Sequence, residues 1–194
     1  MEERYKKREH GIELDGLRDF IRQNGEEITY NSGDQLECEG EPARWWCIVE
    51  KGYFKYMTHG IGDGRKHTVW FSFEDEFMGD YPNLLDGSEA QFTIEAVVDS
   101  RAVRISGEQL EKFFGQNKEA ERLGRRLDRH LLKQFQARYL DFHRATALER
   151  YKLLLQRCPG IIHDLSLQDI ASFLNISPGY LSTIRKEITF SDKK

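Results

Sequence analysis

Apolar and polar residues alternate with a period of two through much of the first half of the chain. Stretches of this kind are typical of half-buried strands, and they are separated by turn-forming clusters at residues 31–34, 51–52 and 60–64. Strands are expected at residues 28–30, 36–38, 45–50, 53–58, 66–73, 92–98 and 101–105. Many short strands at nearly regular spacing with glycine turns indicate an antiparallel barrel or jelly roll.

Helical periodicity dominates outside this region. A short amphipathic helix is expected at residues 16–24, and Ser106 with Gln109 forms a capping box that begins a helix ending near residue 114. Residues 118–143 contain no proline and one glycine, which predicts a long helix. Another helix is expected at residues 148–157, before the helix-breaking pair Pro159-Gly160.

The long helix carries one apolar stripe, with side chains three or four residues apart. Its members are Leu123, Leu127, Leu131, Phe135, Tyr139 and Phe142. A long helix with such a stripe is suited to dimerisation, and we expect the stripe to form the dimer contact. The alternative is that the stripe packs on the strand-rich part of the same chain.

Residues 166–186 have the pattern of a helix-turn-helix. Two short crossed helices would bury the apolar positions Ile170, Ala171, Leu174, Ile176, Leu181 and Ile184. Ser166 with Asp169, and Ser177 with Pro178, mark two helix starts, and Asn175 between them suits the left-handed turn. Apart from its core positions, the second helix carries small and polar residues, which suit a groove of DNA better than a protein core.

The formal charge is divided unevenly along the chain. Residues 1–100 contain 11 lysines and arginines against 22 aspartates and glutamates, a balance of −11, and the remaining residues contain 18 against 11, a balance of +7. The basic part includes the predicted helix-turn-helix. Because phosphate attraction is screened beyond about 8 Å at physiological salt, the acidic part need not cancel it.

Composition excludes several classes of protein. The chain has 194 residues, of which 39% are hydrophobic and 32% charged, and no run approaches the ~18 apolar residues of a membrane span. The charged first eight residues lack the apolar region of a signal peptide, so a cytoplasmic location without membrane association is expected. Cys38, Cys47 and Cys158 have no metal-binding spacing and are interpreted as buried thiols, and no metal site is expected.

The expected fold class is α+β, in three parts: a β-roll at residues 1–117, a dimerisation helix at 118–143 and a helix-turn-helix domain at 144–194. This order resembles the Crp/Fnr transcription regulators, the relatives of the cyclic AMP receptor protein, and most closely their shorter members. The motifs that carry the resemblance are Tyr30-x-x-Gly33-Asp34, Val49-x-x-Gly52, Phe77-Met78-Gly79-Asp80, Ala147-x-x-Arg150-Tyr151 and the helix-turn-helix itself.

The resemblance implies that the roll, a double-stranded β-helix, holds a cyclic-nucleotide-type effector pocket. In cyclic-AMP-binding members, a Gly-Glu-Leu segment contacts the ribose and phosphate, and here Gly79-Asp80-Tyr81 corresponds to it. The Arg-Ser or Arg-Thr pair that neutralises the phosphate falls on Ala90 and Gln91.

The polar pair with which the long helix reaches the base falls on Phe135 and Gln136. Two of the three contact groups are therefore replaced, and a phosphodiester without its arginine loses charge-assisted hydrogen bonds. We expect no useful binding of cyclic AMP and no resident cofactor, while another small-molecule effector remains open. Trp45, Trp46 and Trp70 are candidates for lining an apolar ligand pocket, with core packing as the alternative.

The resemblance also implies a homodimer that binds double-stranded DNA at an inverted repeat, with RNA polymerase as a further partner. The base-reading positions of the family fall on Pro178, Gly179 and Thr183, where its usual Arg and Glu are absent. The complete set of expected DNA-binding residues is Gln168, Ser177, Pro178, Gly179, Tyr180, Ser182, Thr183, Arg185 and Lys186.

The alternatives to DNA-binding regulation are an enzyme and an interaction module. An enzyme of the cupin type would need a His-x-His and carboxylate set for a metal, and the chain has no such pair, so no enzyme is expected. An interaction module with a decayed DNA readout agrees better with the missing base readers. It stays open as the alternative function.

Overall fold

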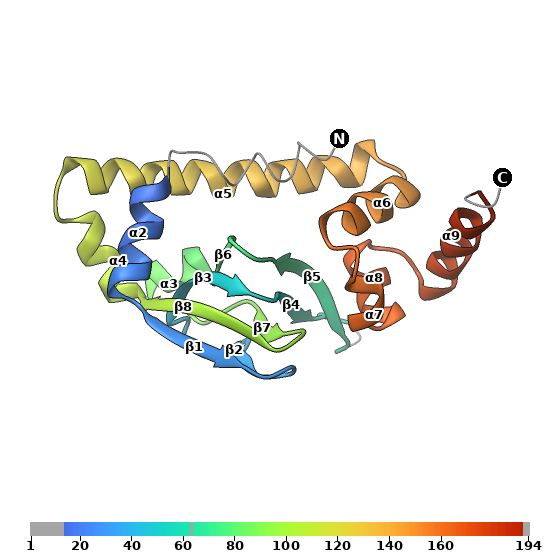
Figure 1. The fold of residues 1–194 in the computed structure, drawn as a ribbon, viewed down its shortest axis with the longest axis horizontal. Coiled ribbons are helices and arrows are strands. Elements are labelled where there is room, and N and C mark those ends of the chain that lie inside the picture. The colour runs from blue at the N-terminus through green and yellow to red at the C-terminus, as the bar shows by residue number, and fades with distance from the viewer. Residues whose placement is uncertain (1–13, 63, 192–194) are drawn as a thin grey trace.

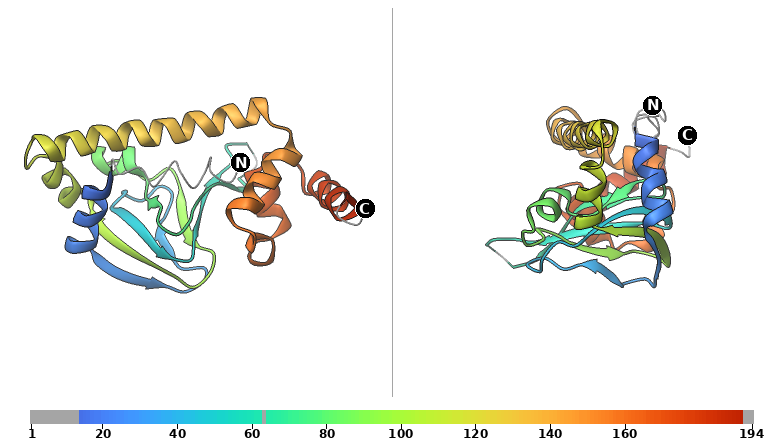
Figure 2. Two further views of the ribbon diagram at one scale, coloured as in Figure 1. Left: turned by 45° about the horizontal axis from the view of Figure 1, so that its top comes forward. Right: turned by 90° about the vertical axis from the view of Figure 1, so that its left-hand side faces the viewer.

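The computed structural model describes residues 14–62 and 64–191, and it has the expected α+β fold. Two antiparallel sheets form the β-roll, and the long helix α5 (Lys118–Arg144) runs along the roll and continues past it (Figures 1 and 2). Helices α2 (Asp15–Asn24) and α4 (Gly107–Phe114) cover one end of the roll. The C-terminal helices, from α6 (Ala147–Arg157) to α9 (Pro178–Ser191), lie at the other end (Figure 1).

The roll consists of two four-stranded sheets with the orders β1-β8-β3-β6 and β2-β7-β4-β5. All of the pairings between these strands are antiparallel. The strands are β1 (Glu26–Tyr30), β2 (Gln35–Glu37), β3 (Trp45–Lys51), β4 (Phe54–His59), β5 (Lys66–Ser72), β6 (Phe77–Met78), β7 (Thr93–Ala96) and β8 (Ser100–Ser106). The predicted jelly-roll arrangement and all seven predicted strands are therefore confirmed.

Strand β3 is buried on both faces, which explains its nearly continuous apolar sequence. Cys47 and Val49 point into a core cluster between the two sheets, together with Phe54 and Ile94 of the opposite sheet. Trp46 and the alternate positions belong instead to a second cluster under the helices. A strand covered on both sides loses the alternation that marks a half-exposed one.

One glycine turn in the roll has a steric reason. Gly52, between β3 and β4, has a φ of 77°, and a Cβ there would collide with the side chain of Ser100. Only glycine combines this left-handed backbone with the close approach of the neighbouring strand. The Val49-x-x-Gly52 motif therefore marks a real packing constraint.

Helices begin and end close to their expected positions. Ser106 makes the predicted capping box with Gln109, and Thr146 makes a second one with Glu149 that the sequence analysis did not identify. The helices are α2 (Asp15–Asn24), α3 (Tyr81–Asp86), α4 (Gly107–Phe114), α5, α6 (Ala147–Arg157), α7 (Ile161–Asp164), α8 (Leu167–Phe173) and α9 (Pro178–Ser191). The two-residue strand β6 and the short helices α3 and α7 were not expected, because a single turn or bridge has no measurable periodicity.

The C-terminal helices share an apolar core with the end of the roll. Phe71 and Phe73 of the roll lie in the same cluster as Leu154, Phe173 and other residues of α6 to α9. The predicted boundary at residue 144 is therefore crossed by continuous packing. Helix α8 also contacts β5, the edge strand of its sheet, and covers it.

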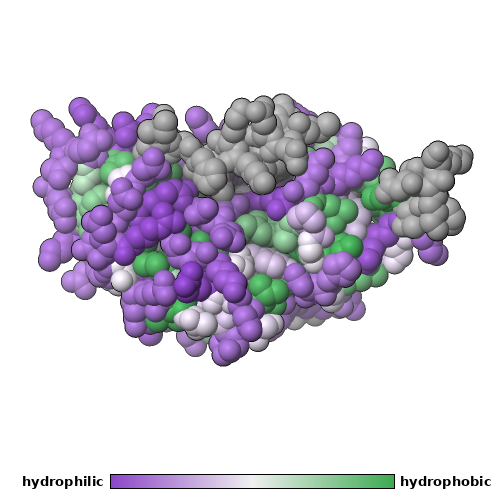
Figure 3. All heavy atoms as spheres, viewed as in Figure 1, coloured by the Kyte–Doolittle hydropathy of each residue, from purple (hydrophilic) through white to green (hydrophobic). Residues whose placement is uncertain are grey.

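The face in Figure 3 is mostly hydrophilic, with small apolar patches between charged residues. Within residues 14–62 and 64–191, no helix has the length and apolar character needed to cross a bilayer.

The three cysteines differ in burial. Cys47 is fully buried, and burial raises the pKa of its thiol. Cys38 and Cys158 are only half-buried, so the expectation of three buried thiols was wrong for these two.

Leu127→Ala tests the packing of α5 on the roll. Leu127 is 0% exposed within the core cluster under α5, so the truncation should lower the free energy of unfolding by about 2–5 kcal/mol. Lys133→Ala is the matched control on the same helix, because Lys133 is exposed and its truncation should cost less than about 0.5 kcal/mol. Chemical denaturation followed by circular dichroism measures both, and equal losses would contradict the packing described here.

Candidate nucleic-acid interface and ligand cavity

Helices α8 and α9 pack on each other through the apolar positions at which a helix-turn-helix is predicted. Ile170, Ala171, Leu174, Leu181 and Ile184 are all buried, and Ile176 is half-buried. The connection turns at Asn175, whose φ is 53°. Its backbone N–H bonds the carbonyl of Ser172 (2.9 Å), and that of Ile176 bonds Ala171 (3.0 Å). The pair therefore shares a close-packed contact and a tight left-handed turn.

Serine residues cap both helices as expected. The Ser166 hydroxyl oxygen accepts from the Asp169 backbone N–H at 3.0 Å, and the hydroxyl donates to the Asp169 carboxylate at 2.7 Å. The reciprocal bond of a full capping box would instead reach the backbone N–H of Ser166. At α9, the Ser177 hydroxyl accepts from the Tyr180 N–H at 3.2 Å, with Pro178 at the first helical position.

The N-terminal half of α9 is open to solvent. Ser177, Pro178, Gly179, Tyr180 and Thr183 are exposed, and Ser182 is half-buried. The hydroxyl of Ser182 donates to the Pro178 carbonyl (3.1 Å) and that of Thr183 to the Gly179 carbonyl (3.4 Å). With their protons used inside the helix, both oxygens keep lone pairs that can accept from a base edge.

The basic residues expected at this surface are placed differently from one another. Lys186 is exposed on α9, and Gln168 is exposed on α8. Arg185 is half-buried, and its charge acts on Tyr151 of α6. Burial raises the pKa of the Tyr151 hydroxyl, and the positive charge of Arg185 lowers it by a smaller amount. The structure thus brings the predicted DNA-binding residues of α9 together on one exposed helix.

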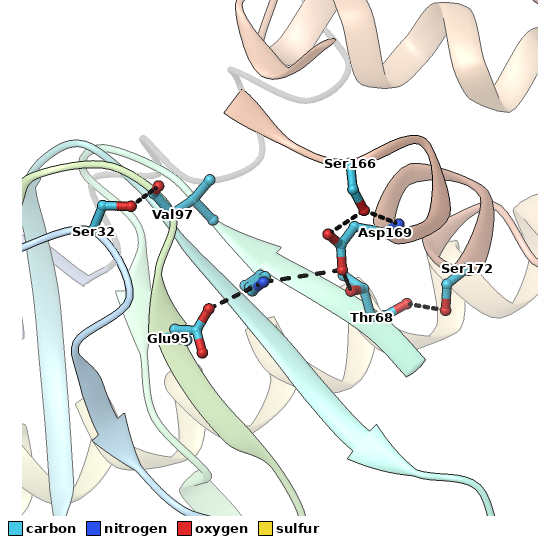
Figure 4. A network of polar contacts seen from close by, with 8 residues as sticks. Ser32, Thr68, Glu95, Val97, Ser166, Asp169 and Ser172 are labelled. Atoms are coloured by element: carbon cyan, nitrogen blue, oxygen red, sulfur yellow. Dashed lines mark hydrogen bonds and ion pairs between the residues drawn. The ribbon is translucent and has the colours of Figure 1, made fainter. Parts of the chain in front are cut away.

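Polar contacts hold α8 against the roll (Figure 4). The Thr68 hydroxyl of β5 donates to the Asp169 carboxylate at 2.9 Å, and the Ser172 hydroxyl donates to the Thr68 carbonyl at 3.4 Å. Lys55 lies between two acids, 3.1 Å from Glu95 and 4.0 Å from Asp169. Helix α8 is therefore fixed to the edge of the sheet from its first turn, at Asp169, to its last, at Ser172.

Two arginines hold the C-terminal end of α8. Arg138 of α5 donates to the Phe173 carbonyl (2.7 Å), and its guanidinium lies 3.7 Å from the centre of the Phe173 ring. Arg150 of α6 donates to the Leu174 carbonyl at 3.0 Å. The last carbonyls of a helix have no partner inside it and carry partial negative charge, so both contacts are favourable. Arg150, from the motif Ala147-x-x-Arg150-Tyr151, therefore helps to position α8.

A cavity of about 640 Å³ lies between the roll and α5. The aromatic residues that line it from the roll side are Trp46, Tyr56, Trp70, Phe77, Tyr81 and Phe92. Helix α5 contributes Leu131, Leu132, Phe135, Tyr139 and Phe142, with the polar residues Asp128, Gln134 and Arg138 between them. Volumes of about 300–1,000 Å³ with mostly apolar walls are typical of small-molecule sites.

The segment 79–81 lines this cavity, as expected, but its polar groups are engaged within the chain. Asp80 is 3% exposed, and its carboxylate accepts from the Gln91 backbone N–H (2.7 Å) and the Asn83 side chain (2.9 Å). The Tyr81 hydroxyl donates to Asp128 at 3.0 Å, and burial together with the charge of that acid raises its pKa. These polar groups form part of the cavity wall, and partners within the chain fix their orientation.

Three expected pocket residues are not among the described residues that line the cavity. Ala90 is 1% exposed and buried under α3, Gln91 points to the Glu89 carbonyl, and Gln136 is exposed on α5. A step of two residues along a helix rotates the side chain by about 200°, so Gln134 faces the roll and Gln136 does not. Among the tryptophans, Trp46 and Trp70 line the cavity, whereas Trp45 packs under Arg104.

The stripe on α5 divides into two parts, which corrects the expected dimer contact. Leu123 and Leu127 are buried in the core of their own chain, and Leu131 packs on the same cluster, so the alternative interpretation holds for this half. Phe142 and Phe135 line the cavity. The exposed large apolar residues of α5 are Leu132, Phe135 (55%) and Tyr139 (65%).

Two residues of this region were missed by the sequence analysis, Arg138 and Leu132. A charged residue on a helix normally indicates a solvated face, and Leu132 lies one position outside the stripe. Only their position relative to the roll and to α8 distinguishes them. No sequence signal available in a single chain identifies such contacts.

Asn175 tests the turn of the helix-turn-helix. Replacement with alanine should cost about 1 kcal/mol, because a residue with a Cβ and no local hydrogen-bonding group is strained at a φ of 53°, whereas Asn175→Gly should be nearly neutral. Hydrogen exchange at the amides of Leu181 and Ile184 should be faster in the alanine variant than in the glycine variant. Equal exchange in the two variants would contradict the assignment of this strain.

The chain is similar to known proteins mainly in structure. Residues 27–117 match the family described as "Cyclic nucleotide-binding domain". A comparison with curated proteins finds no significant match. FixK2 from Bradyrhizobium japonicum superposes with a TM-score of 0.69 at 20% identity, covering 87% of this chain and 86% of that one.

Two further solved structures share the arrangement over nearly the whole chain. The c-di-GMP responsive global regulator CLP from Xanthomonas campestris gives a TM-score of 0.64 at 14% identity, covering 92% of this chain and 93% of that one. The catabolite activator protein of Thermus thermophilus gives 0.53 at 18% identity, covering 95% and 87%. Residues 27–117 thus form a cyclic-nucleotide-binding-type roll, within an overall fold that is also found in these regulators.

Proposed function

We propose that this protein is a dimeric, sequence-specific DNA-binding transcription regulator of the Crp/Fnr type. The observation that carries the proposal is the solvent-exposed N-terminal half of α9, presented by a helix-turn-helix with capped starts and a left-handed turn at Asn175. Regulators among the similar structures support it: CLP is described as a global regulator and the Thermus protein as a catabolite activator. The proposal includes no enzymatic reaction.

In this proposal two recognition helices enter successive major grooves about 34 Å apart, so the operator is an inverted repeat. The exposed side chains of Leu132 and Tyr139 on α5 supply apolar surface for the second copy. Thr183 and Ser182 accept from a base edge, and the Thr183 methyl group contacts a thymine. The sites read in this way tolerate A·T variation more than those read by Arg or Glu.

One feature favours the alternative of an interaction module with a decayed DNA readout. Pro178 and Gly179, at positions where the family reads bases, have no side-chain donor or acceptor. A gel shift with the DNA upstream of the protein's own gene separates the two functions. A regulator shifts this DNA at a concentration where a random duplex of equal length is not shifted, and an interaction module shifts neither or both alike.

The roll of this regulator does not use cyclic AMP. Ala90 and Gln91 replace the arginine pair, and the Asp80 carboxylate already accepts two internal hydrogen bonds. Asp80 and Asp128 add negative charge to the cavity wall, which repels a phosphodiester.

Arg185→Ala tests the DNA contacts of α9. If Arg185 contacts a phosphate, the variant should bind all sequences more weakly, and the slope of log affinity against log salt should fall by about one unit. Fluorescence anisotropy at several salt concentrations measures this. Arg101→Ala, which removes an arginine from a strand of the roll, is the matched control and should leave the slope unchanged. A change in sequence preference alone would show that Arg185 reads bases.

Isothermal titration calorimetry with cyclic AMP and cyclic GMP tests the ligand side of the proposal. The missing arginine should remove charge-assisted hydrogen bonds worth roughly 1.5–3 kcal/mol each, so neither nucleotide should bind measurably at micromolar concentrations. A micromolar dissociation constant for either would overturn this part of the proposal and leave the DNA-binding part intact.

A further inference from the structure

We propose that the cavity under α5 binds a flat aromatic molecule with one anionic group, and that this anion draws Arg138 away from α8 and so loosens the helix-turn-helix. The second half of this inference rests on the proposed function. The first half concerns the cavity alone and does not depend on DNA binding.

The shape and lining of the cavity favour a flat aromatic ligand. The rings of Trp70 and Phe135 lie 5.5 Å apart at an interplanar angle of 35°, and Trp46 stacks on Phe77 at 5.7 Å. Aromatic walls bind flat rings in offset or edge-to-face arrangements. Phe135, at 55% exposure, presents apolar surface at the entrance that such a ligand would cover.

The charges around the cavity limit the ligand to a single anionic group at a defined place. Among the described residues that line it, Arg138 is the one basic side chain, while Asp80 and Asp128 lie at the wall near α3. An anion is attracted at the Arg138 end and repelled at the other end. An aromatic carboxylate matches this asymmetry, whereas a polyanion does not.

Arg138 connects the cavity with the helix-turn-helix. Its guanidinium lies 5.6 Å from the Trp70 ring in the cavity wall and 3.7 Å from the Phe173 ring in α8. The same group donates to the Phe173 carbonyl at the C-terminal end of α8. A movement of this one side chain therefore changes the lining of the cavity and the attachment of α8 together.

A carboxylate competes effectively for this guanidinium. A carboxylate carries a full negative charge where the Phe173 carbonyl carries a partial one, and the planar guanidinium pairs with a carboxylate through two hydrogen bonds at once. When the ligand takes Arg138, α8 keeps its contacts to Arg150 at one end and to Thr68 at the other. The helix-turn-helix then loses one anchor and stays attached to the chain's core.

Binding of 2-naphthoate and of its neutral analogue 2-naphthamide to the full-length protein tests the ligand class. Tryptophan fluorescence should report saturable binding of 2-naphthoate, with Arg138→Gln weakening it about tenfold or more and leaving 2-naphthamide unaffected. Arg129→Gln, an exposed arginine of the same helix, is the matched control and should bind as the original chain does. Absence of 2-naphthoate binding, or equal binding by Arg138→Gln, overturns the proposal.

A second variant keeps the test decisive if Arg138→Gln does not fold. Phe135→Ala removes an exposed ring at the entrance and should weaken both ligands to a similar extent, and unchanged binding would overturn the aromatic site. Sedimentation velocity on the same samples tests whether a second copy of the chain occupies the cavity instead. If 2-naphthoate binds only to monomer at low concentration, α5 of a second copy fills the cavity in the dimer, and the proposal is wrong.

Hydrogen exchange tests the coupling separately from DNA binding. The amides of Leu174, Asn175 and Ile176, whose hydrogen bonds close the end of α8, should exchange several-fold faster with 2-naphthoate bound. Unchanged exchange with saturating ligand overturns the coupling but not the site. Because neither measurement contains DNA, a failed gel shift and a failed ligand titration identify different errors.

Discussion

Helix α5 has 27 residues, and only side chains in its first half are buried against the rest of the chain. Leu123 and Leu127 fix that half to α2, α4 and the sheet. The second half continues rigidly past the contact, because an α-helix without proline does not bend sharply. The cavity, the exposed apolar side chains and the position of the C-terminal helices all follow from this one constraint.

The C-terminal helices are attached to the rest of the chain by three kinds of interaction. The first is an apolar cluster that these helices share with Phe71 and Phe73 of the roll. The Ser172 hydroxyl donates to the Thr68 backbone carbonyl on the edge strand β5, and the Thr68 hydroxyl adds a side-chain bond to Asp169. Arg138 and Arg150 bind the end of α8. A largely buried ion pair between Arg157 of α6 and Glu76 of the roll crosses the same contact.

The cavity lies at the segment Gly79-Asp80-Tyr81, and aromatic rings make up much of its wall. The backbone around Gly79 has a φ of 143°, and a Cβ there would collide with the Trp45 carbonyl and the Trp46 ring, so the segment is built for close packing. Its carboxylate, Asp80, now ties two loops of the protein together. A wall made of aromatic rings and internally paired acids favours a ligand that is mostly apolar, because Asp80 and Tyr81 already have hydrogen-bond partners within the chain.

The sequence by itself determined the elements and their order. Periodicity, capping residues and turn glycines are local signals, and they located the seven strands, the long helix and the helix-turn-helix core of Ile170, Leu181 and Ile184 within a few residues. These features depend on contacts within one turn or one strand pair, so a single chain is enough to identify them.

Only the tertiary structure decided which face of each element meets which neighbour. It assigned Leu127 to the core of its own chain and Leu132 to the surface, moved Ala90, Gln91 and Gln136 out of the cavity lining, and placed Arg138 against α8. The reason is geometric: a step of one residue turns a helical side chain by about 100°, and its surroundings come from segments far away in sequence.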